Sequence, residues 1–334
     1  MGYRKDIFRA QYKDLLKHTS AHVLDCSIED VMFALDSLWK KGRDIKLRSK
    51  RSSNTFRIGR SGCKSDGSSA SFKYNDDEQS IRLPKIGFLK MAEKLRWENK
   101  PSTIRAVTVK KQAGRYFISI SCELEDKPHL PNNQNRHLGI DWGIKTYITA
   151  YDGNDVFEDD FNNDTLIKLD KRIAKYQRSL ARKERFSNNW LKTKTKLEQA
   201  YLNFNNYRLS YIYEIVHAIH ENYDSVTLED LEMTFVTRNR RLAHKAKQKP
   251  FYMLKIALIN KFAQYGKKVY LVPKDYPSTQ TCNSCGNVKT KDEKMKLGES
   301  LYICKACGHE DDRDHNAAKN LYSYKNLTVA TLES

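Results

Sequence analysis

Residues 138–153 read LGIDWGIKTYITAYDG, and this stretch decides how the second half of the chain folds. Its apolar residues form two short runs on either side of Gly143, a pattern typical of two strands joined by a turn. The hydrophobic spacing further along predicts two long helices in 164–222, a strand at 225–231, a helix at 252–265 and a strand at 267–273. Strands that alternate with helices indicate an α/β layer with a largely buried sheet.

Asp141 lies inside the first of these apolar runs. Glu229 lies near the end of the strand expected at 225–231, and Asp314 begins DHNAAKNL, which reads as a packed helix. A carboxylate beside an apolar strand is costly to bury unless it is paired, hydrogen-bonded or bound to a metal ion.

Three such acids in one α/β segment have the chemistry for a nuclease site. If they converge, they can hold two divalent cations about 4 Å apart, which activate a water and stabilise the leaving oxygen of a phosphodiester. Hard oxygen ligands favour Mg²⁺ or Mn²⁺. Taken singly, each acid is more often a surface or capping residue, and Asp314 is also a candidate helix cap. Residue spacing alone leaves both interpretations open.

The cysteines predict a zinc site. Two Cys-x-x-Cys-Gly turns lie 18 residues apart, and their ligands are Cys282, Cys285, Cys304 and Cys307. Each turn can hold two thiolates at about 2.3 Å from a tetrahedral Zn²⁺. Four cysteine ligands leave no position for water, so the zinc is expected to be structural. The other cysteines, Cys26, Cys63 and Cys122, are expected to be buried or inert thiols.

The N-terminal part carries a different pattern. Residues 27–40 read as an amphipathic helix that begins at a Ser27–Asp30 capping box and ends at Gly42. Its apolar residues are expected on one buried face: Ile28, Val31, Leu35, Leu38 and Trp39. Residues 43–126 look β-rich, with a hairpin around Gly114. The segment 126–137 reads as a linker.

Charge points to a polyanionic partner. The chain has 60 Lys and Arg against 41 Asp and Glu, a formal net charge of +19. Such an excess suits nucleic acid, because neutralising phosphates releases counterions. The first helix of 164–222 carries a basic stripe of Lys168, Lys171, Lys175, Arg178, Arg182 and Arg185. The stripe is either an ordinary solvated face or a surface that follows a nucleic-acid backbone.

The two helices in 164–222 are expected to pack through apolar side chains at helical spacing. These are Leu169, Ile173, Tyr176 and Leu180 in the first helix and Leu197, Tyr201 and Phe204 in the second.

No membrane association is expected, because no stretch approaches the roughly 18 consecutive apolar residues of a membrane span. The polar first residues lack the apolar region of a signal peptide. We therefore expect a cytoplasmic protein, nucleoid-associated if prokaryotic, with no small-molecule cofactor.

Several spaced motifs together resemble the TnpB family, the transposon-encoded RNA-guided DNA endonucleases related to type V CRISPR effectors. They are RLPKIG at 82–87, GIDWGIKTYITA at 139–150, TLEDLEM at 227–233, YPSTQTCNSCG at 276–286 and DRDHNAAKNL at 312–321. The resemblance covers nearly all of 20–325. It implies that Asp141, Glu229 and Asp314 are catalytic, with Asp312 a weaker candidate for the third acid.

The resemblance also implies a domain plan. The plan is a helical segment at 1–42, a β-rich wedge-like RNA-binding domain at 43–130, an RNase H-like (RuvC) nuclease domain at 137–276 and 309–325, an inserted zinc ribbon at 277–308 and a tail at 326–334. Guide RNA and target DNA are the implied partners. Basic residues of the 168–185 helix would hold a DNA strand or the RNA–DNA heteroduplex.

A second hypothesis is a nucleic-acid-binding remnant or regulator of the same family without nuclease activity. Family members usually begin with a longer segment that carries an extra strand, and here the match starts nearly at Met1. The three acids argue against a regulator, because a regulator has no need of them. A DNA-joining transposase is a weaker third reading, since no tyrosine or serine recombinase site is evident.

Overall fold

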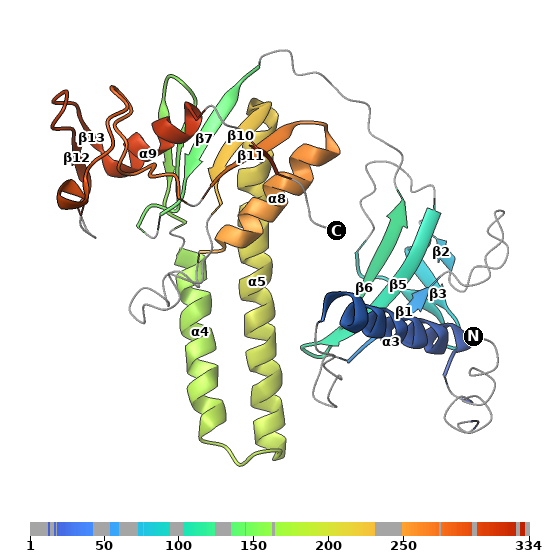
Figure 1. Ribbon diagram of the computed structural model, residues 1–334. Coiled ribbons are helices and arrows are strands. Elements are labelled where there is room, and N and C mark those ends of the chain that lie inside the picture. Colours follow the sequence, from blue (N-terminus) through green and yellow to red (C-terminus); the bar gives the residue numbers. More distant parts are fainter. Residues whose placement is uncertain are drawn as a thin grey trace. The chain divides into compact units, whose positions relative to one another are not determined.

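The computed structural model describes the chain in segments. These are residues 13, 17, 19–42, 54–59, 73–75, 77–93, 103–123, 135–143, 145–161, 164–230, 249–273, 275–295, 299–324 and 328–330. Cys63 and most of the expected linker at 126–137 lie outside them. The chain divides into two compact units, Met1–Asp126 and Lys127–Ser334, and each is described by itself (Figure 1).

The first unit contains one described helix and two small antiparallel sheets. One sheet has the order β1-β5-β6, built from Asn54–Gly59, Thr103–Gln112 and Arg115–Glu123. The other has the order β2-β3-β4, built from Lys73–Asn75, Ser80–Leu83 and Gly87–Lys90. Its core joins residues of both sheets, among them Ile58, Ile81, Leu83, Val107 and Val109.

The expected hairpin at Gly114 is present. Strands β5 and β6 are joined by Ala113 and Gly114, whose φ angles are 52° and 75°. Positive φ at both central residues is the requirement of the tight hairpin turn that matches strand twist. Cys122, expected to be a buried or inert thiol, is half-buried opposite Ile104.

The N-terminal helix is longer than its sequence pattern predicts. Helix α3 runs over Ala21–Lys41 with Ser20 as its N-cap, so the predicted start at a Ser27–Asp30 capping box is wrong. The Ser27 hydroxyl donates to the carbonyl of Val23 one turn earlier, a bond made inside a helix. The predicted end at Gly42 is confirmed by its left-handed φ of 60°.

The single buried face expected for α3 is only partly present. Val31 and Trp39 are exposed, whereas Cys26 is buried against β1, where its Sγ accepts from the Gly59 N–H at 2.8 Å. The helix packs against β1, and Arg57 of that strand pairs with Asp30.

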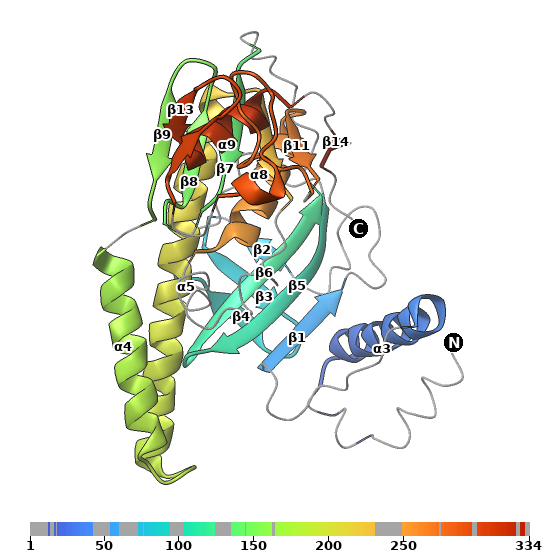
Figure 2. The ribbon, with the colours of Figure 1, turned by 60° about the vertical axis from the view of Figure 1, so that its left-hand side comes forward.

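The second unit is built on a six-stranded sheet of order β14-β11-β10-β7-β8-β9 (Figure 2). The strands are His137–Asp141 (β7), Ile148–Tyr151 (β8), Val156–Asp159 (β9), Ser225–Glu229 (β10), Lys268–Val272 (β11) and Thr328–Val329 (β14). Strands β7, β10 and β11 are parallel to one another. Strand β8 pairs antiparallel with β7, β9 pairs antiparallel with β8, and β14 pairs antiparallel with β11. The predicted α/β character is therefore present.

Helices cover both faces of this sheet. Leu138 and Ile140 of β7 pack with residues of α5 (Asn188–Asn222) and α8 (Phe251–Gln264). Gly139, which points to the opposite face, lies against α9 (Arg313–Tyr322). The sheet is thus a central layer with its core on the α5–α8 side.

The two long helices expected in 164–222 are α4 (Asp164–Ala181) and α5, which pack together as a hairpin that extends beyond the sheet (Figure 1). Ile173 is buried between them, and Leu169, Tyr176, Leu180, Leu197 and Phe204 are half-buried. Tyr201 is 40% exposed, so its predicted burial is wrong. Its hydroxyl instead accepts from Gln177 across the hairpin at 2.6 Å.

Between β11 and α9 lie two short knuckles, the 3-10 turn η1 (Lys291–Glu293) and a two-stranded ribbon, β12 (Leu301–Ile303) and β13 (Glu310–Asp312). Among the described residues, no helix has the length and apolar character needed to cross a bilayer.

Candidate functional site

Asp141 and Glu229 end two neighbouring parallel strands. Leu228 of β10 pairs with Ile140 of β7, so the next residue on each strand, Glu229 and Asp141, lies at the same carboxyl edge of the sheet. Ligand sites in α/β sheets form at this edge. The edge therefore presents two carboxylates from segments 88 positions apart.

Asp314 reaches the same edge on helix α9. The helix lies close to β7 because residue 139 is glycine: a Cβ there would fall 2.3 Å from the Tyr322 nitrogen. Gly139 and Asp141 are two residues apart and so face the same side of the sheet, the side that α9 covers. A Cβ on Gly143 would lie 3.7 Å from Oδ2 of Asp314, so the first turn of α9 is next to the residues that follow Asp141.

The other two acids act electrostatically on Asp141. Asp141 is only 5% exposed, and burial raises its pKa well above the ordinary value; the nearby charges of Glu229 and Asp314 raise it further. Burial also raises the pKa of Glu229 to about 7. These are the shifts expected where carboxylates share a site without a cation.

Arg313 is the counter-charge at this edge. Its guanidinium binds Oδ1 of Asp314 at 2.9 Å and lowers the pKa of Asp141 against the stronger effect of burial. The carboxylates are neighbours rather than a closed cluster. In the described ranges, the four cysteines alone form a group of three or more metal-binding side chains with ligand atoms all within 4.8 Å.

Asp312 has a different task from Asp314. It is the N-cap of α9, and its carboxylate accepts from the backbone N–H of Asp314 at 2.8 Å. A carboxylate used this way stabilises the positive end of the helix. The capping role considered for Asp314 therefore belongs to Asp312. Arg313 pairs with Oδ1 of Asp314, and Oδ2 lies outside that pair.

Trp142 joins the two strand ends. Its indole N–H donates to the backbone carbonyl of Glu229 at 3.2 Å, and its ring packs edge-on against Phe251 of α8. Because Trp142 follows Asp141 directly, this bond ties the carboxyl ends of β7 and β10 together.

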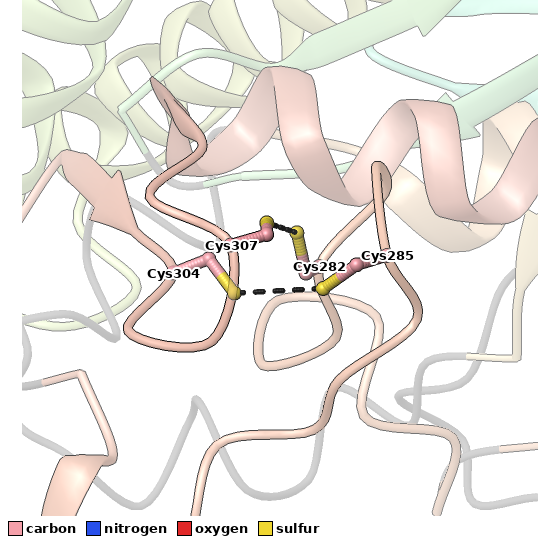
Figure 3. A group of neighbouring side chains, drawn as sticks. All are labelled: Cys282, Cys285, Cys304 and Cys307. Carbon is pink, nitrogen blue, oxygen red and sulfur yellow. Dashed lines mark hydrogen bonds between the residues drawn. The ribbon is translucent and has the colours of Figure 1, made fainter.

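The four cysteines form the group predicted from their spacing (Figure 3). Sγ of Cys282 lies 3.8 Å from Sγ of Cys307, and Sγ of Cys285 lies 3.7 Å from Sγ of Cys304. A tetrahedral zinc with sulfur at about 2.3 Å requires sulfurs about 3.8 Å apart. The backbone N–H of Cys307 lowers the pKa of Cys304 to about 7, which favours its thiolate, whereas burial raises the pKa of the neighbouring Cys282 thiol. This geometry fits Zn²⁺.

Two buried asparagines fasten the first knuckle to α9. The Asn316 side chain accepts from the Asn283 N–H at 3.0 Å and donates to the Thr281 carbonyl at 2.7 Å. Asn320, one turn later, donates to the carbonyls of Ser278 and Thr281. Asn316 and Asn320 are called the amide clasp below. The helix that carries Asp314 is therefore bonded directly to the cysteine site.

Two family models match consecutive parts of the chain. One, described as "Probable transposase", matches residues 119–240, and the other, described as "Cas12f1-like, TNB domain", matches residues 251–321. A protein of Escherichia coli (strain K12), "Putative RNA-guided DNA endonuclease InsQ", is 26% identical over 94% of this chain and 77% of its own length. These matches support the TnpB family for this chain.

Other relatives bear related names. "Putative RNA-guided DNA endonuclease" of Streptomyces pristinaespiralis is 29% identical over 76% of this chain and 62% of that protein. "CRISPR-associated endodeoxyribonuclease Cas12f1" of Sulfoacidibacillus thermotolerans is 24% identical over 62% of this chain and 50% of that protein. A solved Cas12f1–sgRNA–target DNA complex aligns with a TM-score of 0.42 at 15% identity, over 86% of this chain and 75% of that chain.

The quoted motifs contain neighbours of the acids and of the cysteine site that sequence reasoning missed. Trp142, Arg313 and the amide clasp lie within two of the quoted motifs, yet their partners lie far away in the sequence. The one available signal was the pair of amide side chains at helical spacing inside DHNAAKNL.

Proposed function

We propose that this TnpB-family protein is an RNA-guided DNA endonuclease, associated with a transposable element, which hydrolyses phosphodiester bonds. Asp141, Glu229 and Asp314 would hold two Mg²⁺ or Mn²⁺ ions in an RNase H-like (RuvC) nuclease domain. The observation that carries the proposal is the meeting of these acids at one sheet edge, with Asp141 almost fully buried. The printed names of the E. coli and Streptomyces relatives support the RNA-guided activity.

Each residue of the site has a distinct role in this proposal. Bound divalent cations would supply an activated water and a positive charge for the leaving oxygen. Asp141 and Glu229, whose pKa values are raised, lose their protons to become ligands. Trp142 keeps the two strand ends together, and Arg313 neutralises Asp314 in the metal-free protein.

The other parts take supporting roles in this proposal. The four cysteines bind a structural Zn²⁺. The β-rich first unit contacts guide RNA, and the target DNA is selected by base pairing with that guide rather than by protein side chains. The basic stripe at 168–185 is exposed along its length, as a surface that follows phosphates requires.

Cleavage by an Asp141→Ala variant tests the nuclease site. We expect no Mg²⁺-dependent cleavage of target DNA, with RNA binding within a few-fold of the parent protein. The control is Asp160→Asn, which removes an exposed acid just after β9 and should cleave normally. Cleavage by Asp141→Ala at the parental rate would refute the catalytic assignment.

Sequencing of RNA that co-purifies with the protein separates this proposal from the binding remnant. One defined RNA species together with cleavage supports guidance. A protein that retains no defined RNA and leaves DNA intact would instead be the inactive remnant.

A further inference from the structure

The tip of the α4–α5 hairpin exposes an aromatic side chain in an unusual backbone conformation. Phe186 is 64% exposed and has a φ of 70°. A large non-glycine residue in the left-handed region costs free energy, and a large apolar ring in water adds to that cost. Most of the ring remains in solvent, so the position calls for a further explanation.

Cations and a second ring surround Phe186. The Arg185 guanidinium lies 5.0 Å from the centre of the Phe186 ring. The centre of the Trp190 ring, in the first turn of α5, lies 5.4 Å from the same point. The Lys194 ammonium lies 5.5 Å from the Trp190 ring. Two aromatic faces flanked by two positive charges form a surface that suits a planar, electron-rich group next to an anion.

The tip is held rigidly by its own bonds. Ser187 caps α5 by accepting from the Trp190 N–H at 3.2 Å, and its hydroxyl donates to the Glu184 carbonyl at 2.8 Å. Lys183, two residues after the end of α4, donates to the Asn189 carbonyl in the first turn of α5. Phe186 is therefore presented in a fixed position, which reduces the entropy lost when a partner binds.

The charge around the tip selects the class of partner. Residues 164–199 contain eleven Lys and Arg but only four Asp and Glu. A hydrophobic protein partner would not require this excess, whereas a phosphate backbone does. Unpaired nucleotides combine both needs, since their bases stack on aromatic rings while their phosphates meet cations.

We propose that Arg185, Phe186, Trp190 and Lys194, called the tip cluster, form a binding site for single-stranded DNA in which an unpaired base stacks on Phe186. The choice of DNA rests on the proposed function, because the hairpin belongs to the unit that carries the nuclease acids. In the proposed guided reaction, pairing of the guide with one DNA strand displaces the other strand, and a stacking platform would stabilise that unpaired strand.

Binding of a 12-nucleotide single strand of alternating thymidine and 2-aminopurine to the full chain tests this site. Without divalent cations, the measurement is independent of cleavage, so a failed nuclease proposal would not affect it. We expect Phe186→Leu to weaken binding about five- to hundredfold and to reduce the quenching of 2-aminopurine fluorescence, which reports stacking. Phe186→Tyr, which keeps the aromatic face, should bind like the parent protein.

Salt dependence and a matched control separate stacking from charge and from misfolding. The slope of log affinity against log salt should be unchanged in Phe186→Leu and smaller by about one in Lys194→Ala. Tyr213→Leu removes an aromatic ring that is 60% exposed elsewhere on α5, and it should leave binding unchanged. Parental binding by Phe186→Leu would overturn the proposal. The proposal would also be overturned if Phe186→Leu lost as much affinity for duplex DNA as for single-stranded DNA, or lost affinity only for single-stranded RNA of the same sequence.

Discussion

Asp141 is a residue whose charge works against the fold that holds it. The side chain is almost fully buried at the end of β7, and the neighbouring Glu229 and Asp314 add like charge. A carboxylate buried beside other carboxylates is typical of a functional site, where the ionised form takes part in binding or catalysis. At the scale of single residues, function and stability are therefore expected to conflict at this position.

Replacing Asp141 with asparagine should reveal that conflict. Asp141→Asn keeps the shape of the side chain and removes the buried charge, so the metal-free protein should gain about 1–3 kcal/mol in its free energy of unfolding at pH 8. Thermal and denaturant unfolding measure the gain, and the same variant should lose Mg²⁺-dependent cleavage. A less stable variant would indicate that Asp141 has a structural role instead.

The raised pKa of Glu229 predicts a pH-dependent stability. The folded protein holds this proton up to about pH 7, whereas the unfolded chain releases it near the ordinary value of about 4.5. The folded state thus binds more protons between these values, and the metal-free protein should lose stability as pH rises from 5 to 8. Melting temperatures across this range check the slope, which should be flatter in Glu229→Gln. Added Mg²⁺ should restore stability most at the high-pH end.

At the residue scale, the sequence predicts the three acids but not their contacts. Asp141 lies inside an apolar run, Glu229 lies near the end of one, and Asp314 begins an expected helix, so position and resemblance together select them. The pairing of Arg313 with Asp314 was not visible, because the direction of a side chain at the first turn of a helix depends on what packs around it. The separation of roles between Asp312 and Asp314 likewise needed the cap geometry of α9.

Among the elements, α9 depends on a single missing side chain. Gly139 lets the helix lie directly on β7, where a Cβ would fall 2.6 Å from the Ala318 carbonyl oxygen as well as 2.3 Å from the Tyr322 nitrogen. Both contacts are with backbone, which cannot rotate away. The approach of α9 to the sheet is what brings Asp314 near Asp141.

Gly139→Ala should therefore damage both stability and activity. The helix must shift outward, and we expect a loss of about 2–4 kcal/mol together with a cleavage rate lowered at least tenfold. Gly42→Ala offers a contrast, because its Cβ would meet nothing within 4 Å and only the left-handed φ is strained, for a loss of about 1 kcal/mol. Equal losses in the two variants, measured by denaturant unfolding, would contradict the role of close approach.

Secondary structure in the second unit was predictable because its elements have strong hydrophobic periods. Strands β7, β10 and β11 and helices α4, α5 and α8 all lie near their predicted positions. Helix α3 was misjudged for a physical reason. Ser20, its actual N-cap, makes no side-chain capping bond, while Ser27 offers a capping pattern in the middle of the helix. The sequence signal for a helix start was therefore stronger at Ser27 than at Ser20, the true N-cap.

At the scale of the whole molecule, the cysteine site and the acidic edge are linked through one helix. The amide clasp bonds α9 to the first knuckle, and Asn316 is fully buried there. Loss of zinc should therefore affect the carboxylates even though zinc does not take part in the proposed hydrolysis.

Chelation tests this link. Removing zinc should unfold the knuckles, since structural zinc contributes on the order of 10 kcal/mol to folding. We expect cleavage to fall by tenfold or more at saturating Mg²⁺, and readdition of zinc to restore it. Metal analysis of the purified protein should find one zinc per chain. If zinc-free protein cleaves at the parental rate, the ribbon does not position Asp314.

The amide clasp also limits how this chain can be made smaller. An engineer who excised residues 277–308 to obtain a compact nuclease would strip Asn316 and Asn320 of the carbonyls they now satisfy. Buried amides without partners are costly, so such a deletion would have to replace both asparagines with apolar residues at the same time.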